Sequence, residues 1–322
     1  MVRIGIAGAG NIGTHYIEQF PATANVDVSA IYDANPEALL PYSTLTTYTQ
    51  FDEFLTACDA LILCTPKESH FMLAAEAMRK GKHILMVHPV SLNLKESAEL
   101  LSLSKESNVR CMIGGTERFN AAWTSIQDGI QNPMFIEGHR LAVYNPDISR
   151  NSVILDLMIQ DIDLVLRIVK SEIKRISASG MAVLSESIDI ANARLEFSNG
   201  CIANLTASRV SLKDMNKLRI FQKNGYHSVD FLHSKADFIS IQSKPTQKDS
   251  QVIPVTTDLN ESKLIEIQSK THPNFSPTPI EIASFLDCVQ QHKTPVVSIQ
   301  DTYLNLDIAH RIIRKIHYSE EK

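Results

Sequence analysis

Three glycines near the N-terminus follow a short apolar run and precede a segment with helical spacing. They are Gly8, Gly10 and Gly13, in the pattern Gly-x-Gly-x-x-Gly. In turns that bind dinucleotides, the first glycine allows a tight turn, the second lets a pyrophosphate approach the backbone, and the third permits close helix–strand packing. The following helix would offer unpaired N–H groups and partial positive charge to the phosphates. The pattern also occurs in loops that only turn the chain, but its place between a strand and a helix favours cofactor binding.

An acidic residue, Asp33, follows the second predicted strand, Asn25 to Tyr32, and lies about 20 residues after Gly13. That spacing is typical of the carboxylate that binds the ribose 2′-hydroxyl of NAD. A carboxylate there would repel the 2′-phosphate of NADP, because the two groups carry like charges. The sequence therefore favours NAD, with a turn and helix start at Asp33-Ala-Asn-Pro36 as the alternative role of this residue.

Two polar side chains, Asp156 and Gln160, begin a stripe on a predicted helix, residues 152–169, that is otherwise strongly apolar. Asp163 and Arg167 continue it, so the spacing is four, three and four residues and the stripe occupies one face. A nearly apolar helix is buried, and polar groups on it need partners or a wet cavity. The stripe indicates either a cleft lined by Asp156 and Gln160 or an internal network that includes an Asp163–Arg167 pair.

The elements that would position these residues alternate between strand and helix over the first third of the chain. This alternation predicts right-handed crossovers and a doubly wound parallel sheet of the Rossmann type, whose ligands bind beyond the carboxyl ends of the strands. We therefore expect the strand ends at Gly8, Asp33, Cys64 and His88 to line one crevice. The further predicted strands are Ala60–Cys64, His83–Val87 and Val109–Ile113, and the helices are Thr14–Phe20, Thr65–Lys80 and Leu94–Lys105.

After residue 118 the pattern changes to consecutive strands with short turns. Strands without crossovers predict a mostly antiparallel, open sheet, and Asn199-Gly200 is a hairpin signal. We therefore predict an α/β chain with a Rossmann domain over 1–118 and an α+β substrate and oligomerisation domain over 119–322. The second domain is expected to contain helices at 121–130, 152–169, 280–291 and 302–317, strands at 135–144, 176–183, 188–197, 201–208, 218–221, 227–232 and 238–241, and weak strands and loops over 243–279.

Composition excludes several classes of protein. A net charge of -5, from 31 basic and 36 acidic residues, gives no basic footprint, so we expect no nucleic-acid partner. No apolar run approaches the roughly 18 residues of a membrane span, and the first residues do not resemble an export signal. The five cysteines are scattered and form no Cys-x-x-Cys pair, so neither a zinc site nor a disulfide framework is indicated. We expect no bound metal and a cytoplasmic protein with buried, reduced thiols.

An ordered series of motifs along essentially the whole chain resembles the Gfo/Idh/MocA family of oxidoreductases. These motifs are the glycine turn, Cys64-Thr65-Pro66 with His70, Gly81 to Pro89, Arg118-Phe119-Asn120, Asp156 to Asp163, and Pro295 to Asp301. Within the family, the chain looks most like the branch similar to UDP-N-acetylglucosamine 3-dehydrogenases. The segments that carry this second resemblance are Asp156 to Leu166, Asp189 to Arg194 and Ala203 to Arg209.

The resemblance implies NAD as cofactor and a sugar or nucleotide sugar as substrate, with oxidation of the 3-hydroxyl to a ketone in the branch named. It also implies a homodimer or homotetramer formed through the second sheet. The cofactor-binding residues would be Gly8, Gly10, Asn11, Ile12, Gly13, Asp33, Cys64, Thr65, Pro66, His70, Val87 and His88. Arg140 and Arg209 are weaker candidates for contact with a diphosphate, because the guanidinium fork suits phosphate oxygens.

Two positions depart from the family pattern. Val87-His88-Pro89 stands where the family has Glu-Lys-Pro, and Gln160 stands where it has the catalytic histidine. Gln160 can orient a sugar but cannot accept a proton at neutral pH, whereas a histidine can act as a base near pH 7. We therefore take His88 as the candidate general base, with Asp156 orienting it or the substrate. One alternative is a catalytically degenerate protein that binds NAD and a nucleotide sugar as a sensor or partner subunit. The other is hydride transfer in the reductive direction or to a different acceptor, with water supplying the protons.

Overall fold

The protein is described here from a computed structural model that covers residues 2–20, 28–88, 93–146, 151–242, 251–256, 262–273 and 275–320. The chain divides into two compact units, each made of two stretches of sequence. The first unit comprises Met1–Phe119 and Ser276–Leu304, and the second comprises Asn120–Phe275 and Asn305–Lys322. Among the described residues, no helix combines the length and the apolar character needed to cross a membrane.

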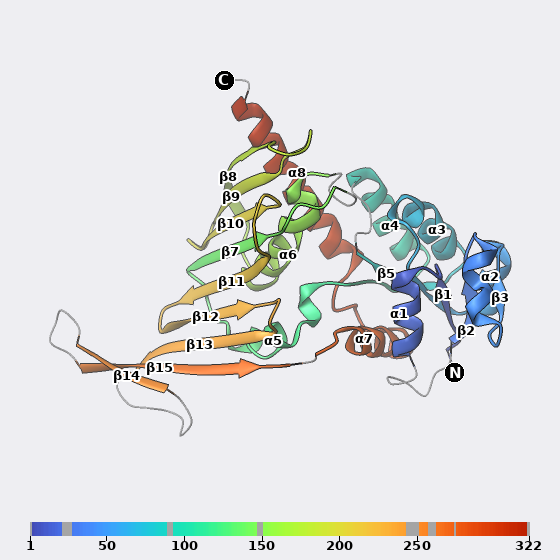
Figure 1. Cartoon of the computed structure of the whole chain (residues 1–322), viewed down its shortest axis with the longest axis horizontal. Coiled ribbons are helices and arrows are strands. Elements are labelled where there is room, and N and C mark those ends of the chain that lie inside the picture. The colour runs from blue at the N-terminus through green and yellow to red at the C-terminus, as the bar shows by residue number, and fades with distance from the viewer. Residues whose placement is uncertain are drawn as a thin grey trace. The chain divides into compact units, whose positions relative to one another are not determined.

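The first unit is built on a six-stranded parallel sheet in the order β3-β2-β1-β4-β5-β6 (Figure 1). The register places the last residues of neighbouring strands at one edge, since Ala7 pairs with both Tyr32 and Leu63, and Val87 pairs with Gly114. The predicted doubly wound sheet is confirmed. Its strands are β1 Ile4–Ala7, β2 Val28–Tyr32, β3 Thr47–Tyr48, β4 Ala60–Leu63, β5 His83–Val87 and β6 Cys111–Gly114. The predicted start of β2 at Asn25 lies outside the described residues.

Helices surround this sheet because its central strands are apolar on both faces. All residues of β1 and β4 are buried, as expected of strands in a parallel sheet that is covered on both sides. The helices of this unit are α1 Asn11–Gln19, α2 Phe51–Ala57, α3 Lys67–Arg79, α4 Leu94–Glu106 and α7 Thr278–Gln290, with 3₁₀ turns at Pro36–Tyr42 and Glu117–Phe119. The sequence analysis did not predict α2, which is only seven residues long.

Helix α7 is the main difference from the predicted domain division. The break at Phe119 agrees with the predicted boundary to within one residue, but the prediction left residues 276–304 in the second domain. In the structure Ile282 and Phe285 of α7 belong to the same apolar core as the parallel sheet. The helical pattern over 280–291 could not reveal this, because amphipathic spacing identifies the buried face of a helix and not the sheet that covers it.

The second unit contains a nine-stranded sheet in the order β14-β15-β13-β12-β11-β7-β10-β9-β8 (Figure 1). Every neighbouring pair is antiparallel except β7 and β10, which run parallel. The predicted open, mostly antiparallel sheet is confirmed. Its strands are β7 Phe135–Leu141, β8 Ile173–Met181, β9 Ile190–Phe197, β10 Ile202–Ser208, β11 Met215–Gln222, β12 Gly225–Asp230, β13 Lys235–Gln242, β14 Gln251–Thr256 and β15 Ser262–Thr271.

The predicted hairpin between β9 and β10 forms, with a three-residue loop. Phe197 N–H donates to the Cys201 carbonyl at 2.9 Å, and Gly200 N–H donates to the Phe197 carbonyl at 3.0 Å. Gly200 has φ +87°, the left-handed conformation that closes such loops and that favours glycine.

Strands β14 and β15 lie within residues 243–279, for which weak strands and loops were predicted. β15 pairs through residues 264–271 with the whole length of β13, and with β14 on its other side. Pro254 lies in β14. β14 is the edge strand of the sheet, where a residue without an N–H donor is tolerated.

The helices of the second unit include a short α5, Ala121–Thr124, followed by a 3₁₀ turn at Gln127–Gly129 in place of the predicted helix to residue 130. The predicted helix over 152–169 forms as a π-helical turn, Ile154–Met158, that continues into α6, Ile159–Ile168. α8, Ile299–Glu320, completes the chain, and the division between the two units falls within it. All five cysteines are buried and free, as predicted.

Candidate cofactor and active site

Gly8 sits where β1 ends, in a conformation that other residues rarely adopt. Its φ is +103°, and its N–H donates to the Tyr32 carbonyl at 2.7 Å. A Cβ atom here would lie 2.8 Å from the carbonyl carbon of Cys64 and the nitrogen of Thr65. Both the backbone angle and this contact require glycine, so the first glycine makes the tight turn that its spacing predicted.

Gly13 is closely packed, whereas Gly10 has open space beside it. A Cβ atom on Gly13 would lie 1.8 Å from the Gly8 carbonyl oxygen, which shows how closely α1 packs on the turn. A Cβ atom on Gly10 would meet no protein atom within 4 Å. The bare backbone at Gly10 therefore faces open space, as a turn that receives a pyrophosphate must.

The N-terminus of α1 has no side chain that caps it. Gly10 is the N-cap residue, and no side-chain oxygen accepts from the first turn. Asn11 and Ile12 are exposed, while the Thr14 N–H closes the first helical bond on the Gly10 carbonyl at 2.9 Å. The first N–H groups of the helix thus remain available to an anion, with the partial positive charge of the helix dipole behind them.

The Asp33 carboxylate is held against the glycine turn. Its Oδ2 accepts from the Ala9 N–H at 2.8 Å, and its Oδ1 accepts from the Asn35 N–H at 2.8 Å. Asn35 in turn caps the following 3₁₀ turn through the Glu37 N–H. The hydrogen bond from Asn35 is the turn chemistry that the sequence suggested. The hydrogen bond from Ala9 places the carboxylate beside the glycine turn, where a ribose would bind.

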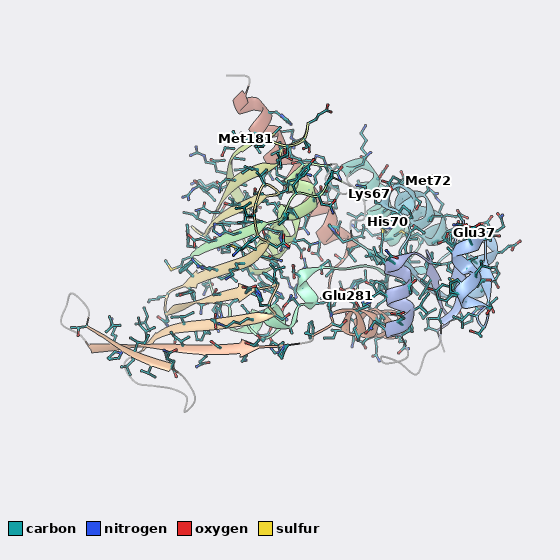
Figure 2. The ribbon with its side chains drawn as sticks, viewed as in Figure 1. Glu37, Lys67, His70, Met72, Met181 and Glu281 are labelled. Carbon is teal, nitrogen blue, oxygen red and sulfur yellow. The ribbon has the colours of Figure 1, made fainter. Side chains whose placement is uncertain are left out.

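The segment Thr65-Pro66 follows β4, whose end pairs with β1, and leads into α3. His70, labelled in Figure 2, lies inside α3 with 3% of its surface exposed. Its Nε2 donates to the Thr65 carbonyl at 2.6 Å. The Ser69 hydroxyl donates to the Thr65 Oγ1 at 2.9 Å. His70 therefore supports the turn after Cys64 from within, and its direct contact with a cofactor stays a prediction.

His88 follows β5 at the same edge of the sheet as Gly8 and Asp33. Its N–H donates to the Gly114 carbonyl at 3.1 Å, and the residue is half-buried. Gly115 has φ +69°, and a Cβ atom on it would lie 3.9 Å from the His88 Cβ. The ordered backbone of β5 and β6 therefore fixes the position of His88, while Pro89 of the predicted motif lies outside the described residues. The structure thus brings eight of the twelve predicted cofactor-binding residues to the ends of four neighbouring strands or the turns after them. The other four, Asn11, Ile12, Gly13 and His70, lie in the first turns of α1 and α3.

A buried carboxylate behind this edge was not predicted. Glu281 of α7, labelled in Figure 2, is 1% exposed. Its Oε2 accepts from the Tyr16 hydroxyl at 2.7 Å, and its Oε1 accepts from the Gly115 N–H at 2.9 Å. Burial raises the pKa of Glu281, while its two hydrogen bonds act in the opposite direction. Tyr16 belongs to α1, so Glu281 ties the glycine-turn helix to the end of β6. A single glutamate in an amphipathic helix carries no signal by which this role could have been found.

In the second unit, Asp156 and Gln160 lie at the π-helical turn and the start of α6, and both are half-buried. The Asp156 Oδ1 accepts from the Asn151 Nδ2 at 3.0 Å, and its Oδ2 lies 3.7 Å from a guanidinium nitrogen of Arg209. Within the described part of the chain, Gln160 has no hydrogen-bond partner. Its amide is therefore available to a ligand.

The rest of the predicted stripe does not share this role. Asp163 is buried, and its Oδ1 accepts from the Asn305 Nδ2 at 2.7 Å, whereas Arg167 is exposed. The sequence offered Arg167 as the partner of Asp163 because it is one helical turn away. The observed partner comes from α8, which local spacing could not identify.

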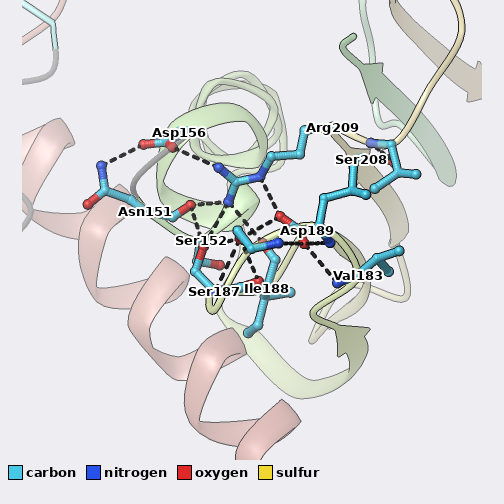
Figure 3. Close-up of polar contacts among 12 residues, drawn as sticks. Asn151, Ser152, Asp156, Val183, Ser187, Ile188, Asp189, Ser208 and Arg209 are labelled. Carbon is cyan, nitrogen blue, oxygen red and sulfur yellow. Dashed lines mark hydrogen bonds and ion pairs between the residues drawn. The ribbon is translucent and has the colours of Figure 1, made fainter. Parts of the chain in front are cut away.

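The side chains of Arg209 and Arg140 pair with carboxylates of the second unit rather than with a diphosphate. Arg209 is 4% exposed, and its Nε lies 3.0 Å from the Asp189 Oδ1, while its terminal nitrogen donates to the Ile188 carbonyl at 3.2 Å (Figure 3). Arg140 pairs with the buried Asp161 at 2.8 Å. The interpretation of these two arginines as phosphate ligands was wrong, because each has a buried carboxylate as its partner.

Asp189 is the most heavily bonded carboxylate of this cluster. Its Oδ2 accepts from the backbone N–H groups of Val183, Leu184 and Ser185 at 2.7, 2.6 and 2.9 Å. The Ser185 hydroxyl donates to its Oδ1 at 2.7 Å. Burial by itself would raise the pKa of Asp189, but these hydrogen bonds outweigh it and lower the pKa to about 2.

Asp189→Asn is expected to reduce the free energy of unfolding at pH 7 by about 2.5 kcal/mol, the equivalent of a depression of nearly two pKa units. Because the folded pKa lies below the unfolded one, this stabilisation is complete above about pH 5 and is lost as pH falls toward 2. Urea unfolding of both proteins between pH 7 and pH 2.5 measures the difference, which should shrink on acidification. Glu186→Gln, which removes an exposed carboxylate of the same loop, is the control. A difference that does not change with pH would contradict this account of Asp189.

Comparison with known families identifies both parts of the chain. Residues 2–115 match the family model described as an oxidoreductase family with an NAD-binding Rossmann fold, GFO_IDH_MocA. Residues 133–228 match the GFO/IDH/MocA C-terminal domain. The first match covers the six parallel strands, and the second covers strands β7 to most of β12.

Several characterised proteins are similar over most of the chain. UDP-N-acetylglucosamine 3-dehydrogenase from Acidithiobacillus ferrooxidans is 32% identical over 237 residues, which cover 72% of this chain and 75% of that protein. The scyllo-inositol 2-dehydrogenase (NAD(+)) of Bacillus subtilis is 24% identical over 267 residues, covering 78% and 73%. A solved structure of the Acidithiobacillus ferrooxidans enzyme matches with a TM-score of 0.83 at 26% identity, covering 98% of this chain and 97% of that one.

Proposed function

This chain belongs to the Gfo/Idh/MocA family of oxidoreductases, and we propose that it oxidises a hydroxyl group of a sugar or nucleotide sugar with NAD. Bound NAD would supply a nicotinamide carbon that accepts the hydride. The protein must then bind the dinucleotide, hold the substrate, and remove the hydroxyl proton. The observation that carries the proposal is the open backbone at Gly10 before an uncapped helix.

The first unit fits NAD in three respects. The glycine turn gives room for the pyrophosphate, the first N–H groups of α1 favour its negative charge, and the Asp33 carboxylate is suited to a ribose hydroxyl. The same carboxylate disfavours a 2′-phosphate. We therefore expect NAD to be preferred over NADP.

His88 is proposed as the general base. As hydride leaves the carbon, the hydroxyl proton must go to a group that is neutral near pH 7 and able to accept it, and an imidazole meets this requirement. In this role His88 takes the proton from the substrate hydroxyl and passes it to solvent. Its place after β5, at the edge that carries the glycine turn, supports this role.

Asp156 and Gln160 are proposed to bind the substrate from the second unit. Gln160 can donate and accept hydrogen bonds but cannot take the proton, so its role is to orient a sugar hydroxyl. The guanidinium of Arg209 and the amide of Asn151 hold Asp156 in place. The similarity to UDP-N-acetylglucosamine 3-dehydrogenase suggests this nucleotide sugar as substrate and its 3-hydroxyl as the reacting group. Assembly into a homodimer or homotetramer through the second sheet stays a prediction.

The test is NADH formation by the purified protein with UDP-N-acetylglucosamine, other nucleotide sugars and free sugars, with NAD or NADP as cofactor. We expect oxidation of at least one nucleotide sugar or sugar, with NAD preferred. Binding of NAD without NADH formation on any of these substrates would instead favour the second candidate, a protein that binds NAD and a sugar without turnover. That candidate is supported by Gln160, which cannot act as a base. Failure to bind either dinucleotide would overturn both.

A further inference from the structure

A cavity of about 210 Å³ lies within the second unit, and neither Asp156 nor Gln160 lines it. Its sheet side is formed by one face of three adjacent strands, since His227 of β12 pairs with Phe238 of β13, and Phe238 pairs with Gln268 of β15. Ala236 and Lys270, two residues along their strands from Phe238 and Gln268, point to the same face. The opposite side comes from the segment after α5.

His227 is the polar group that makes this cavity unusual. It is 4% exposed, and in the part of the chain that the structure describes neither ring nitrogen makes a hydrogen bond of ordinary geometry, although the backbone of Gly129 lies close to the ring. Its ring stacks on Phe238 with centroids 4.5 Å apart and planes 22° apart. Burial lowers the pKa of His227, while the nearby backbone of Gly129 raises it by a smaller amount. The neutral imidazole ring offers one hydrogen-bond donor and one acceptor. A buried donor or acceptor without a partner destabilises the protein, and a ligand that pairs with it would offset this cost.

The volume of the cavity and the residues that line it limit the class of ligand that could bind. An apolar cavity of about 150 Å³ is large enough for benzene, so this one has room for a six-membered ring with one further polar group. Ile126, Ala236 and Phe238 give the ring apolar surroundings. Gln268 is half-buried and Lys270 is exposed, so the positive charge lies at the mouth.

We propose that this cavity is a binding site for a small planar carboxylate of the size of benzoate. Its ring packs on Ile126 and Phe238, and its carboxylate accepts hydrogen bonds from the Lys270 ammonium and the His227 imidazole. A charge-assisted bond to Lys270 is stronger than a neutral one, which favours an acid over an amide. The residues that line the cavity are different from those proposed to bind NAD or the sugar.

Calorimetric titration of the full chain with benzoate tests the proposal. A ligand of this size is expected to bind with a dissociation constant on the order of 1 mM. The histidine resonance that is absent from the His227→Phe spectrum should shift in the wild type on addition of benzoate. Benzamide, which has the same shape without the charge, should bind about tenfold more weakly.

Three variants separate the parts of the site. His227→Phe keeps the ring that stacks on Phe238 but removes both nitrogens, and should weaken benzoate binding about tenfold. Lys270→Met removes the charge at the mouth, with a similar effect. Gly129→Ala would place a methyl group 3.5 Å from the His227 Cε1, an ordinary contact that the fold tolerates, and should block the cavity. Lys174→Met, which changes an exposed lysine of β8, should bind like the wild type.

The outcomes decide the proposal. Loss of affinity in the three cavity variants, with Lys174→Met unchanged, supports it. No saturable binding of benzoate to the wild type would overturn it. Equal affinities in the wild type and in Gly129→Ala would also overturn it, because benzoate would then bind elsewhere. Equal binding of benzamide and benzoate would overturn the assignment of a carboxylate ligand.

Discussion

His88→Ala is expected to lower kcat for sugar oxidation by about 10²–10⁴-fold, the usual contribution of a general acid–base group. The reason is that Gln160, the side chain proposed to orient the substrate, cannot accept the hydroxyl proton. His88 then has to provide this step without help from a second base. The dissociation constant for NAD should change little, because the glycine turn and Asp33 remain intact.

Steady-state kinetics and an NAD titration measure the two effects separately. Gln160→His is the complementary variant, since it supplies a second group that can take a proton, and it should raise kcat. Equal loss of NAD affinity and of kcat in His88→Ala would show that His88 binds the cofactor and is not the base. Unchanged kcat would remove it from the reaction altogether.

Gly10→Ala is expected to weaken NAD binding by about 100-fold, equivalent to about 2.7 kcal/mol, without loss of stability. The new methyl group would meet no protein atom within 4 Å, and the φ of Gly10, -74°, suits alanine. The methyl group would, however, occupy the space through which a pyrophosphate approaches the backbone. The effect is therefore expected on the cofactor alone.

Gly13→Ala provides the contrast, because its Cβ would lie 1.8 Å from the Gly8 carbonyl oxygen. That contact forces α1 away from the turn, so this variant should lose stability as well as NAD binding. Thermal unfolding and calorimetric titration of both variants test the distinction. Wild-type NAD affinity in Gly10→Ala would mean that the pyrophosphate does not bind at this turn.

The sequence was most informative where local chemistry determines structure. The environments of Gly8, Gly10 and Gly13 were predicted correctly, because a glycine turn between a strand and a helix makes the same three demands wherever it occurs: a backbone angle that favours glycine, open space and close helix packing. Asp33 was likewise found by its spacing. The alternation of apolar strands and amphipathic helices predicted the parallel sheet for the same reason.

The parts that could not be predicted depend on contacts between distant segments. Glu281 lies more than half the chain away from its partners Tyr16 and Gly115. Asp163 pairs with Asn305 rather than with the nearer Arg167. The Arg209 guanidinium is a group that often binds phosphate, and only its ion pair with Asp189 shows that it is buried inside the second unit. In each case the residue type was visible in the sequence, and its partner was not.

The central claim is that hydride passes from a sugar carbon to NAD on this protein. The most direct measurement uses UDP-N-acetylglucosamine that carries deuterium at carbon 3, incubated with NAD and the purified protein, followed by mass spectrometry of the dinucleotide. We predict reduced NAD that contains the deuterium and a substrate that has become a 3-ketone. Absence of reduced NAD under conditions in which NAD and the nucleotide sugar both bind would contradict the account.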